Sequence, residues 1–194
     1  MEPLGWEDPL PHRPRRILIS GASGSGKSTL SRALSASLSV PYHELDALYH
    51  GPQWVPRPQF IADVIAVAAN ERWVTEWQYS AVRPILLARA DLIVWLDLPR
   101  WRVMSQLVAR TVVRRLRRIE LWNGNVEPPL WTLITDHDHI LRWAWQAHSR
   151  TRDRMRDVLA APECPMVVRL RSRREVQSWL SGPVQRVASA PRGP

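Results

Sequence analysis

Residues 17–29 read ILISGASGSGKST, and this stretch decides the fold that we expect for the rest of the chain. It begins with a short apolar run that ends at Gly21, as a buried strand does where it enters a turn. From Gly21 onward it matches the pattern G-x-x-x-x-G-K-[ST], the P-loop that binds phosphate groups. The residues after Thr29 repeat apolar side chains at helical spacing. The sequence therefore predicts a strand, a phosphate-binding turn and a helix, and with them a nucleoside triphosphate as ligand.

The residues of the P-loop have distinct predicted roles. Its glycines allow the backbone to turn successive N–H groups toward an anion, and the following helix directs its positive end to the same place. Lys27 is the only lysine among 27 lysine and arginine residues, and its compact ammonium group would reach between the phosphates. The hydroxyl of Ser28 would bind Mg²⁺, and Thr29 would reach the α-phosphate. The predicted phosphate-binding residues are Gly21, Ser23, Gly24, Ser25, Gly26, Lys27, Ser28 and Thr29.

The composition fits a single domain with a full hydrophobic core. The chain has 194 residues, of which 45% are hydrophobic, and no run approaches the roughly 18 apolar residues of a membrane span. Residues 1–14 contain acids and prolines but no apolar segment like that of a signal peptide. A single cysteine, Cys164, fits a reducing compartment. We therefore expect a cytoplasmic protein with one domain at residues 15–181 and mobile tails at residues 1–14 and 182–194.

Strand and helix patterns alternate along the chain. Apolar or β-branched runs predict five strands, at residues 17–19, 40–45, 72–77, 92–97 and 166–170. The segments between these runs show helical periodicity. Five strands separated by helices predict an α/β fold in which helices cover both faces of a parallel sheet. Ligands of such sheets bind at the carboxyl ends of the strands, which is where the P-loop lies.

Three acidic residues follow predicted strands and should reach that same edge of the sheet: Asp46, Glu76 and Asp97. Asp97 ends an apolar strand and so resembles the Walker B acid, which holds water molecules bound to the metal. Asp46 is the rival or partner of Asp97 for this metal role. Asp46 or Glu76 would orient or deprotonate the hydroxyl group of an acceptor. The alternative for each of the three is an ordinary turn or helix-capping acid.

A cluster of arginines predicts a lid. Arg110, Arg114 and Arg118 are spaced four residues apart, with Arg117 beside them, so one helix face carries charges that repel one another unless an anion arrives. We expect this helix and the loop after it, about residues 114–135, to close over the triphosphate. A solvated basic face is the alternative interpretation.

The net charge of +9 raises the question of a nucleic-acid partner. A polyphosphate substrate would also demand positive charge. A second cluster, Arg150, Arg152 and Arg154, would complete the clamp around the triphosphate or else form a solvated basic face. The sequence contains no recognisable nucleic-acid-binding module, so nucleic acid is the less favoured partner.

The sequence resembles the bacterial topology modulation proteins, a family of P-loop kinases that are similar in turn to adenylate and shikimate kinases. The resemblance spans roughly residues 15–181, and its most specific parts are the Leu-Asp-Ala-Leu turn at residues 45–48 and the Leu-Trp-Asn-Gly-Asn segment at residues 121–125. The other matching segments are Ile17–Leu30, Arg72–Val74, Tyr79–Ser80, Ala90–Pro99, the arginine-rich helix and Arg169–Ser172.

This resemblance implies an adenylate-kinase-like fold with strand order 2-3-1-4-5, a core, an acceptor-binding region and a lid. It implies that Asp46 faces the acceptor and the metal, that Arg114 and Arg118 grip phosphates, and that Arg171 and Ser172 border the adenine. One segment departs from the family. Relatives commonly read WVIDGNYS where residues 73–80 read WVTEWQYS. The longer acid and the added tryptophan indicate an altered acceptor pocket.

The leading hypothesis is an ATP-dependent kinase that uses Mg²⁺ and transfers the γ-phosphoryl group to a nucleotide or a small hydroxylated metabolite. Arg83 or Arg57 would bind the phosphate of a nucleoside monophosphate, whereas Asp46 would be the main polar contact of a neutral metabolite. One alternative is an ATP-dependent regulator that binds nucleic acid, and another is an ATP-binding protein that has lost its acceptor site. The predicted catalytic residues are Lys27, Asp46, Arg114 and Arg118, and the acceptor residues are Asp46, Glu76, Tyr79 and Arg83.

Overall fold

A computed structural model describes residues 2–116, Asn123 and residues 137–190, with backbone alone at residues 110–112, 114–116 and 137–148. The strands are β1 (Arg16–Gly21), β2 (Tyr42–His43), β3 (Trp73–Glu76), β4 (Leu92–Leu96) and β5 (Met166–Leu170). The α-helices are α1 (Lys27–Leu38), α2 (Leu45–Tyr49), α3 (Phe60–Ala69), α4 (Arg83–Leu87), α5 (Arg100–Leu116), α7 (His137–Ala160), α8 (Arg173–Trp179) and α9 (Gln185–Ser189). A 3₁₀ turn, η1 (Pro52–Trp54), and a π-helical turn, η3 (Leu180–Val184), complete the described elements. Among these helices none has both the length and the apolar character needed to cross a membrane.

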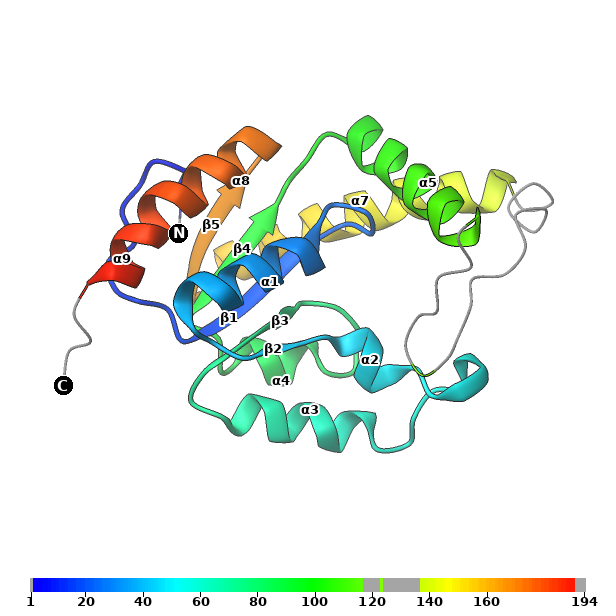
Figure 1. The fold of residues 1–194 in the computed structure, drawn as a ribbon, viewed down its shortest axis with the longest axis horizontal. Helices are drawn as coiled ribbons and strands as arrows, with labels where there is room; N and C mark the ends of the chain where they lie inside the picture. Colours follow the sequence, from blue (N-terminus) through cyan, green and yellow to red (C-terminus); the bar gives the residue numbers. More distant parts are fainter. Residues whose placement is uncertain (1, 117–122, 124–136, 191–194) are drawn as a thin grey trace.

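The five strands form one parallel sheet in the order β2-β3-β1-β4-β5 (Figure 1). The central strand is β1, in which Ile17 lies opposite Val74 of β3 and opposite Leu92 of β4. A central strand of a covered parallel sheet is buried on both faces, which explains the continuous apolar run at its centre. The predicted α/β fold and its strand order are confirmed.

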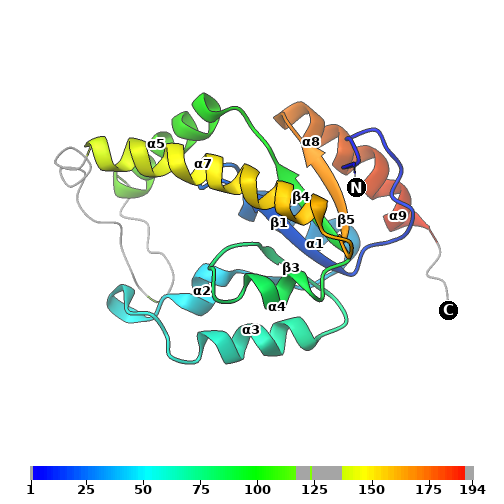
Figure 2. The same ribbon diagram turned by 180° about the vertical axis from the view of Figure 1, so that it is seen from behind.

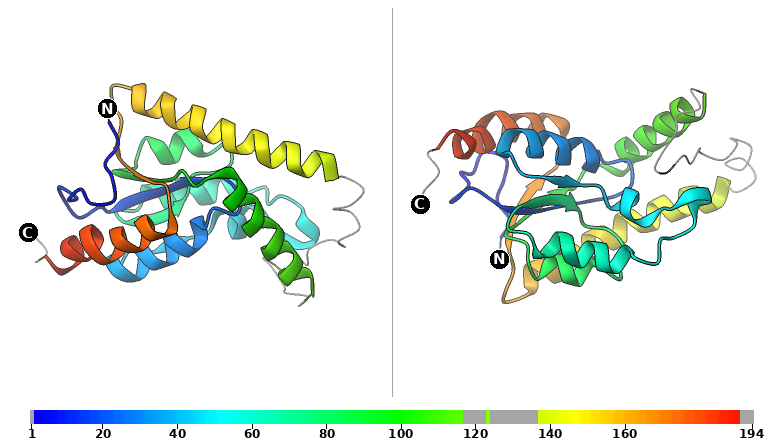
Figure 3. Two further views of the ribbon diagram at one scale, coloured as in Figure 1. Left: turned by 90° about the horizontal axis from the view of Figure 1, so that it is seen from above. Right: turned by 60° about the horizontal axis from the view of Figure 1, so that its bottom comes forward.

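The sheet separates two hydrophobic cores. Ile17 and Ile19 pack on the side of α1, α8 and α9, whereas Leu18 packs on the side of α3, α4 and α7, because successive side chains of a strand point to opposite faces. Figure 2 shows α7 crossing one face of the sheet together with α3 and α4, and Figure 3 shows α1, α8 and α9 on the other face. Trp179 fills the first core and Trp73 the second, and both side chains are fully buried.

The second strand is shorter than its sequence pattern predicts. A strand is expected over residues 40–45, but β2 contains only Tyr42 and His43. Leu45 begins α2 instead, and its side chain is fully buried in the core beside α3. Asp46 therefore lies in the first turn of a short helix, where the helix dipole favours a carboxylate.

The described parts of the two ends, residues 2–14 and 182–190, pack against the domain, which differs from the expectation of mobile tails at residues 1–14 and 182–194. Near the N-terminus, Leu4 pairs with Val168 of β5 in a parallel bridge, and Leu10 is buried in the core. Near the C-terminus, Pro183 and Val184 are buried, and α9 continues the chain to Ser189. These few apolar residues stand between prolines and polar residues, so they form no periodic pattern that a sequence analysis can detect.

The packing of the C-terminal end can be tested with Val184→Ala. Val184 is fully buried against the α1 face of the sheet, so removing two methyl groups should lower the free energy of unfolding by about 2 kcal/mol. Urea unfolding followed by circular dichroism measures this change. The neighbouring exposed Gln185 provides the control, since Gln185→Ala should leave stability nearly unchanged. Equal stability of both variants and the wild type would contradict the described packing.

Candidate active site

The P-loop joins β1 to α1 through backbone that favours glycine. Gly24 and Gly26 have φ angles of +85° and +94°, and a Cβ atom on Gly24 would lie 3.0 Å from the carbonyl oxygen of Val103. No side chain caps α1 at Gly26, so the first N–H groups of the helix can face an anion. The Nζ atom of Lys27 donates a hydrogen bond of 3.3 Å to the carbonyl oxygen of Ala22, which holds the ammonium group across the loop.

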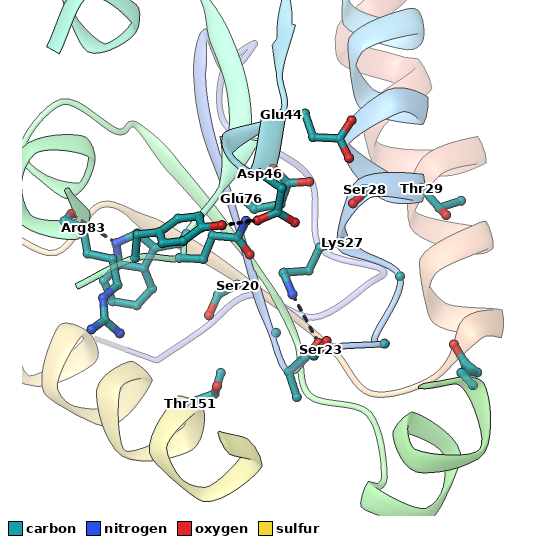
Figure 4. A pocket seen from close by; sticks show the side chains of 18 of the residues that line it. Ser20, Ser23, Lys27, Ser28, Thr29, Glu44, Asp46, Glu76, Arg83 and Thr151 are labelled. Carbon is teal, nitrogen blue, oxygen red and sulfur yellow. Dashed lines mark hydrogen bonds between the residues drawn. The ribbon is translucent and has the colours of Figure 1, made fainter. Parts of the chain in front are cut away.

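A cavity of about 860 Å³ opens at the carboxyl ends of β1 and β3 (Figure 4). The P-loop forms one wall of this cavity. Of the eight predicted phosphate-binding residues, all line the cavity except Ser25, which is buried within the loop. The opposite wall consists of α2 with the residue before it, the stretch from the end of β3 to the start of α4, and part of α7. From these elements come Glu44, Asp46, Glu76, Gln78, Tyr79, Arg83, Thr151 and Arg154.

Asp46 is held by two hydrogen bonds on this opposite wall. Both end at its Oδ1 atom, with Gln78 Nε2 donating at 2.7 Å and the Tyr79 hydroxyl at 2.5 Å. No hydrogen bond from the described part of the chain reaches Oδ2 of Asp46. The pKa of Tyr79 is raised, first by burial and then by its hydrogen bond to Asp46 and the charge of that carboxylate. Tyr79 therefore stays protonated and fixes Asp46 as a hydrogen-bond acceptor.

Tyr79 holds this position with an unusual backbone. Its φ angle is +59°, a left-handed conformation that is costly for a bulky residue and is concentrated at functional sites. The ring stacks on Tyr49 at 4.3 Å between centroids and meets Phe60 edge-on. The surrounding aromatic side chains thus fix the Tyr79 hydroxyl against Asp46.

Glu76 brings a second carboxylate into the cavity. It is 2% exposed, and its Oε1 atom accepts a hydrogen bond of 2.6 Å from the Tyr42 hydroxyl. Its Oε2 atom is buried and has no hydrogen-bond partner within the described part of the chain. The pKa of Tyr42 is raised by burial and by Glu76, so Tyr42 remains a donor to Glu76. In Figure 4, Asp46 and Glu76 lie between Ser28 on one side and Arg83 on the other.

Asp97 does not line the cavity, although the sequence predicts that it holds metal-bound water there. Its Oδ1 atom accepts from Arg152 Nε at 2.7 Å, and its Oδ2 atom accepts from Arg169 Nε at 3.0 Å. Burial alone would raise the pKa of Asp97, but the two guanidinium groups outweigh burial and hold this pKa below its usual value. Both carboxylate oxygens are thus engaged in ion pairs that tie β4 to α7 and β5. This arrangement does not support Asp97 as the acid that holds metal-bound water.

Asp97→Asn should lower the free energy of unfolding by about 2 kcal/mol at pH 7, because two arginines lose their charged partner. The folded pKa of Asp97 is lowered, so its stabilising contribution is complete above the ordinary pKa of 3.8 and is lost as the pH falls through the folded value. Urea unfolding at neutral pH and at acid pH tests this, and the two proteins should converge in acid. Asp153→Asn is the control, because Asp153 forms only an exposed pair with Arg156. A constant difference at all pH values would contradict the ion-pair role.

The second arginine cluster divides between different sides of α7. Arg154 lines the cavity, whereas Arg152 turns to Asp97 and Arg150 is exposed and does not line the cavity. Of the three arginines predicted to complete the clamp, only Arg154 lines the cavity. Arg83, a predicted acceptor residue, does line the cavity.

The loop predicted to border the adenine reaches the cavity through Arg173 and not through the two predicted residues, Arg171 and Ser172. Ser172 caps α8 by accepting a hydrogen bond of 3.1 Å from the Glu175 N–H, and the Arg171 N–H donates to the Glu175 carboxylate at 2.7 Å. Neither Arg171 nor Ser172 lines the cavity, but the next residue, Arg173, does.

The predicted lid lies largely outside the described residues. Arg110 and Arg114 belong to α5, of which only the backbone is described at these positions. Arg117, Arg118 and most of residues 114–135 fall outside the description. Asn123 is described, and its side-chain amide donates a hydrogen bond to the carbonyl oxygen of His50, next to the cavity.

Three residues in or beside the cavity were not among the predicted site residues: Arg32 and Gln78, which line it, and Tyr42, which contacts Glu76 from outside the lining. Gln78 contacts Asp46, Tyr42 contacts Glu76, and Arg32 forms an ion pair of 3.3 Å with Glu44. Gln78 stands in the segment that departs from the related family, which is the one hint the sequence contains. The roles of Tyr42 and Arg32 depend on the packing of β2 and α1 and have no local pattern.

A solved structure with a similar fold supports this description. A gluconokinase from Sinorhizobium meliloti 1021 superposes with a TM-score of 0.52 at 19% identity, over 91% of this chain and 95% of that one. The chain has a P-loop NTPase fold. A shikimate kinase from Acinetobacter baumannii, in complex with shikimate, gives a TM-score of 0.49 at 14% identity over 90% of this chain and 88% of that one. No protein-family model and no curated protein matches the sequence.

Proposed function

We propose that this protein is an ATP-dependent phosphotransferase that transfers the γ-phosphoryl group to a hydroxyl group of a small metabolite or nucleotide. One observation carries the proposal. The P-loop, with Lys27, and a hydrogen-bonded carboxylate, Asp46, form opposite walls of the same cavity. Phosphoryl transfer needs a phosphate cradle and a positioned acceptor within reach of one another. The P-loop kinases of similar fold are consistent with this assignment.

The donor side of the reaction belongs to the P-loop. Its backbone N–H groups and the start of α1 would bind the phosphates, and Lys27 would neutralise charge on them as it develops. Arg110, Arg114, Arg117 and Arg118 would close over the same phosphates as a lid. This lid would make the enzyme adenylate-kinase-like and would place it with the topology modulation proteins that its sequence resembles.

The residues around Ser28 fit a magnesium ion. Glu76 Oε2 is a buried carboxylate oxygen without a hydrogen-bond partner in the described residues, and hydroxyl and carboxylate oxygens are the ligands that Mg²⁺ prefers. Ser28 would bind the ion directly, while Glu76 would hold its water molecules, with Asp46 as a second candidate. When bound, the ion would supply charge neutralisation at the β- and γ-phosphates.

Asp46 would act on the acceptor. Tyr79 and Gln78 occupy its Oδ1 atom, so Oδ2 is oriented to accept the proton of the acceptor hydroxyl. The hydroxyl oxygen would then form a bond to the γ-phosphorus as the bond to the β–γ bridging oxygen breaks, and ADP would leave. A positioned carboxylate is sufficient for this step, because the transition state demands positioning more than strong base catalysis.

The experiment that tests the function is ADP release from ATP and Mg²⁺, measured against nucleoside monophosphates and small hydroxylated metabolites with an acceptor-free control. Stimulation by one acceptor, absent in Asp46→Asn, would support the kinase and identify its substrate. If no compound stimulates ADP release although the protein still binds ATP, the proposal is contradicted. That result would favour the ATP-dependent regulatory alternative, for which steeply salt-dependent nucleic-acid binding is the next measurement.

A further inference from the structure

Two arginines from different elements line the acceptor side of the cavity. Arg83 opens α4, and its carbonyl oxygen accepts a hydrogen bond of 3.2 Å from Trp77 Nε1, which fixes the start of that helix. Arg154 comes from α7, on the turn next to Thr151. Both side chains are half-buried and line the cavity. Arg83 lies across the cavity from Ser28 and Thr29, on the far side of Asp46 and Glu76 (Figure 4).

Among the described residues, neither of these two guanidinium groups has an acidic partner. Arg154 donates from Nε to the carbonyl oxygen of Arg150 at 2.9 Å and from a terminal nitrogen to the Thr151 hydroxyl at 3.1 Å, both on its own helix. Within the described part of the chain, no carboxylate forms an ion pair with Arg83 or Arg154. The pKa of Arg154 is lowered, first by burial and then by the positive charge of Arg83. Both positive charges thus face the same cavity.

Three other basic residues line the cavity, and one of them, Arg173, is exposed rather than half-buried. Arg32 pairs with Glu44, and Lys27 belongs to the P-loop. Two unneutralised arginines in a half-buried wall are costly unless a ligand brings negative charge, because like charges repel more strongly away from water. Planar guanidinium groups suit carboxylate and phosphate oxygens in particular.

We propose that the acceptor is a hydroxylated acid, whose carboxylate or phosphate group binds between Arg83 and Arg154 while its hydroxyl group faces Asp46. This proposal rests on the proposed function and narrows it, because it disfavours the neutral metabolites that the sequence left open. A nucleoside monophosphate and a hydroxy or sugar acid share the required chemistry, an acid group separated from a free hydroxyl group.

Matched pairs of compounds test the proposal. Each acid is compared with its neutral counterpart: gluconate with glucitol, quinate with a cyclohexane polyol, and cytidine and adenosine monophosphates with their nucleosides. ADP release measures turnover, and calorimetry in the presence of excess MgADP measures binding with the P-loop filled. The carboxylate pairs and the phosphate pairs are separate arms, so the preferred arm identifies which acid group the site takes.

The variants are Arg83→Gln and Arg154→Gln, with Arg156→Gln as the control. Arg156 stands two residues from Arg154 on the same helix, but it is exposed and pairs with Asp153 outside the cavity. We expect each cavity variant to weaken the acid's kcat/KM or binding about tenfold or more, since each removes a charged hydrogen bond. The KM for ATP should stay unchanged, and the control should behave as the wild type.

Three results would overturn the proposal: equal use of acids and neutral counterparts, an unchanged acid affinity in both cavity variants, or a loss confined to ATP affinity. The last would assign the arginines to the triphosphate. Failure of the kinase itself gives a different pattern. Suppose that no compound is turned over, but acids still bind in the presence of MgADP and bind more weakly to Arg154→Gln. This result would support the acid-binding site and contradict the proposed phosphotransferase activity. If neither turnover nor acid binding occurs, both are overturned.

Discussion

Replacing Asp46 with asparagine is expected to lower kcat by about 10²- to 10⁴-fold while the affinity for MgATP stays close to that of the wild type. Asparagine keeps an oxygen that accepts from Tyr79 and Gln78, so the shape of the wall is preserved. It loses the negative charge and the ability to take the acceptor's proton. Steady-state kinetics with the identified acceptor measure kcat, and calorimetry with MgADP measures nucleotide binding.

The control for this substitution is Asp153→Asn, which changes the same functional group on the exposed side of α7. Its kinetics should match the wild type. A kcat for Asp46→Asn within a few-fold of the wild type would remove Asp46 from the chemical step. A lost affinity for nucleotide with unchanged kcat would instead assign Asp46 to the metal, the role that the sequence also allowed.

The second large effect is expected for Glu76→Gln. Glu76 has a buried carboxylate oxygen without a partner in the described residues, and we propose that this oxygen holds water bound to Mg²⁺. Glutamine keeps the side chain's size and its hydrogen bond with Tyr42 but removes the charge. The affinity for Mg²⁺ in the presence of ATP should fall about 10- to 100-fold, as for other groups that support a metal indirectly. Titration of Mg²⁺ at fixed ATP, followed by tryptophan fluorescence and by ADP release, measures this change.

Asp97→Asn is the informative comparison, because Asp97 is one of the acids that the sequence offers for the same metal role. In the structure Asp97 is engaged by Arg152 and Arg169, so its variant should keep the Mg²⁺ affinity of the wild type at temperatures where it is folded. An opposite outcome, with Mg²⁺ affinity lost in Asp97→Asn and kept in Glu76→Gln, would reverse the assignment in favour of Asp97, the acid that resembles the Walker B residue in the sequence.

The sequence by itself determined the fold and one wall of the cavity, because both depend on local patterns. The residues that let the P-loop bind phosphate lie within one short stretch of sequence. Gly24 and Gly26 adopt the positive-φ conformations that the turn needs, and Lys27 follows them directly. The alternation of apolar strands and amphipathic helices is also local, and it predicted the parallel sheet. The positions of Asp46 and Glu76 near strand ends followed from the same pattern.

Only the tertiary structure decided which charges meet in the cavity. Arg152 and Arg154 are two residues apart, and a helix turns by about 200° over that distance, so they point to nearly opposite sides of α7. Which of them faces the cavity depends on how Met155 and Val158 pack α7 against the sheet. This packing brings together segments that are far apart in the chain. Asp97 likewise follows its strand as the pattern predicts, but the pairing with Arg152 and Arg169 exists only because α7 and β5 converge on it. Pairings between distant segments leave no periodic trace in the sequence.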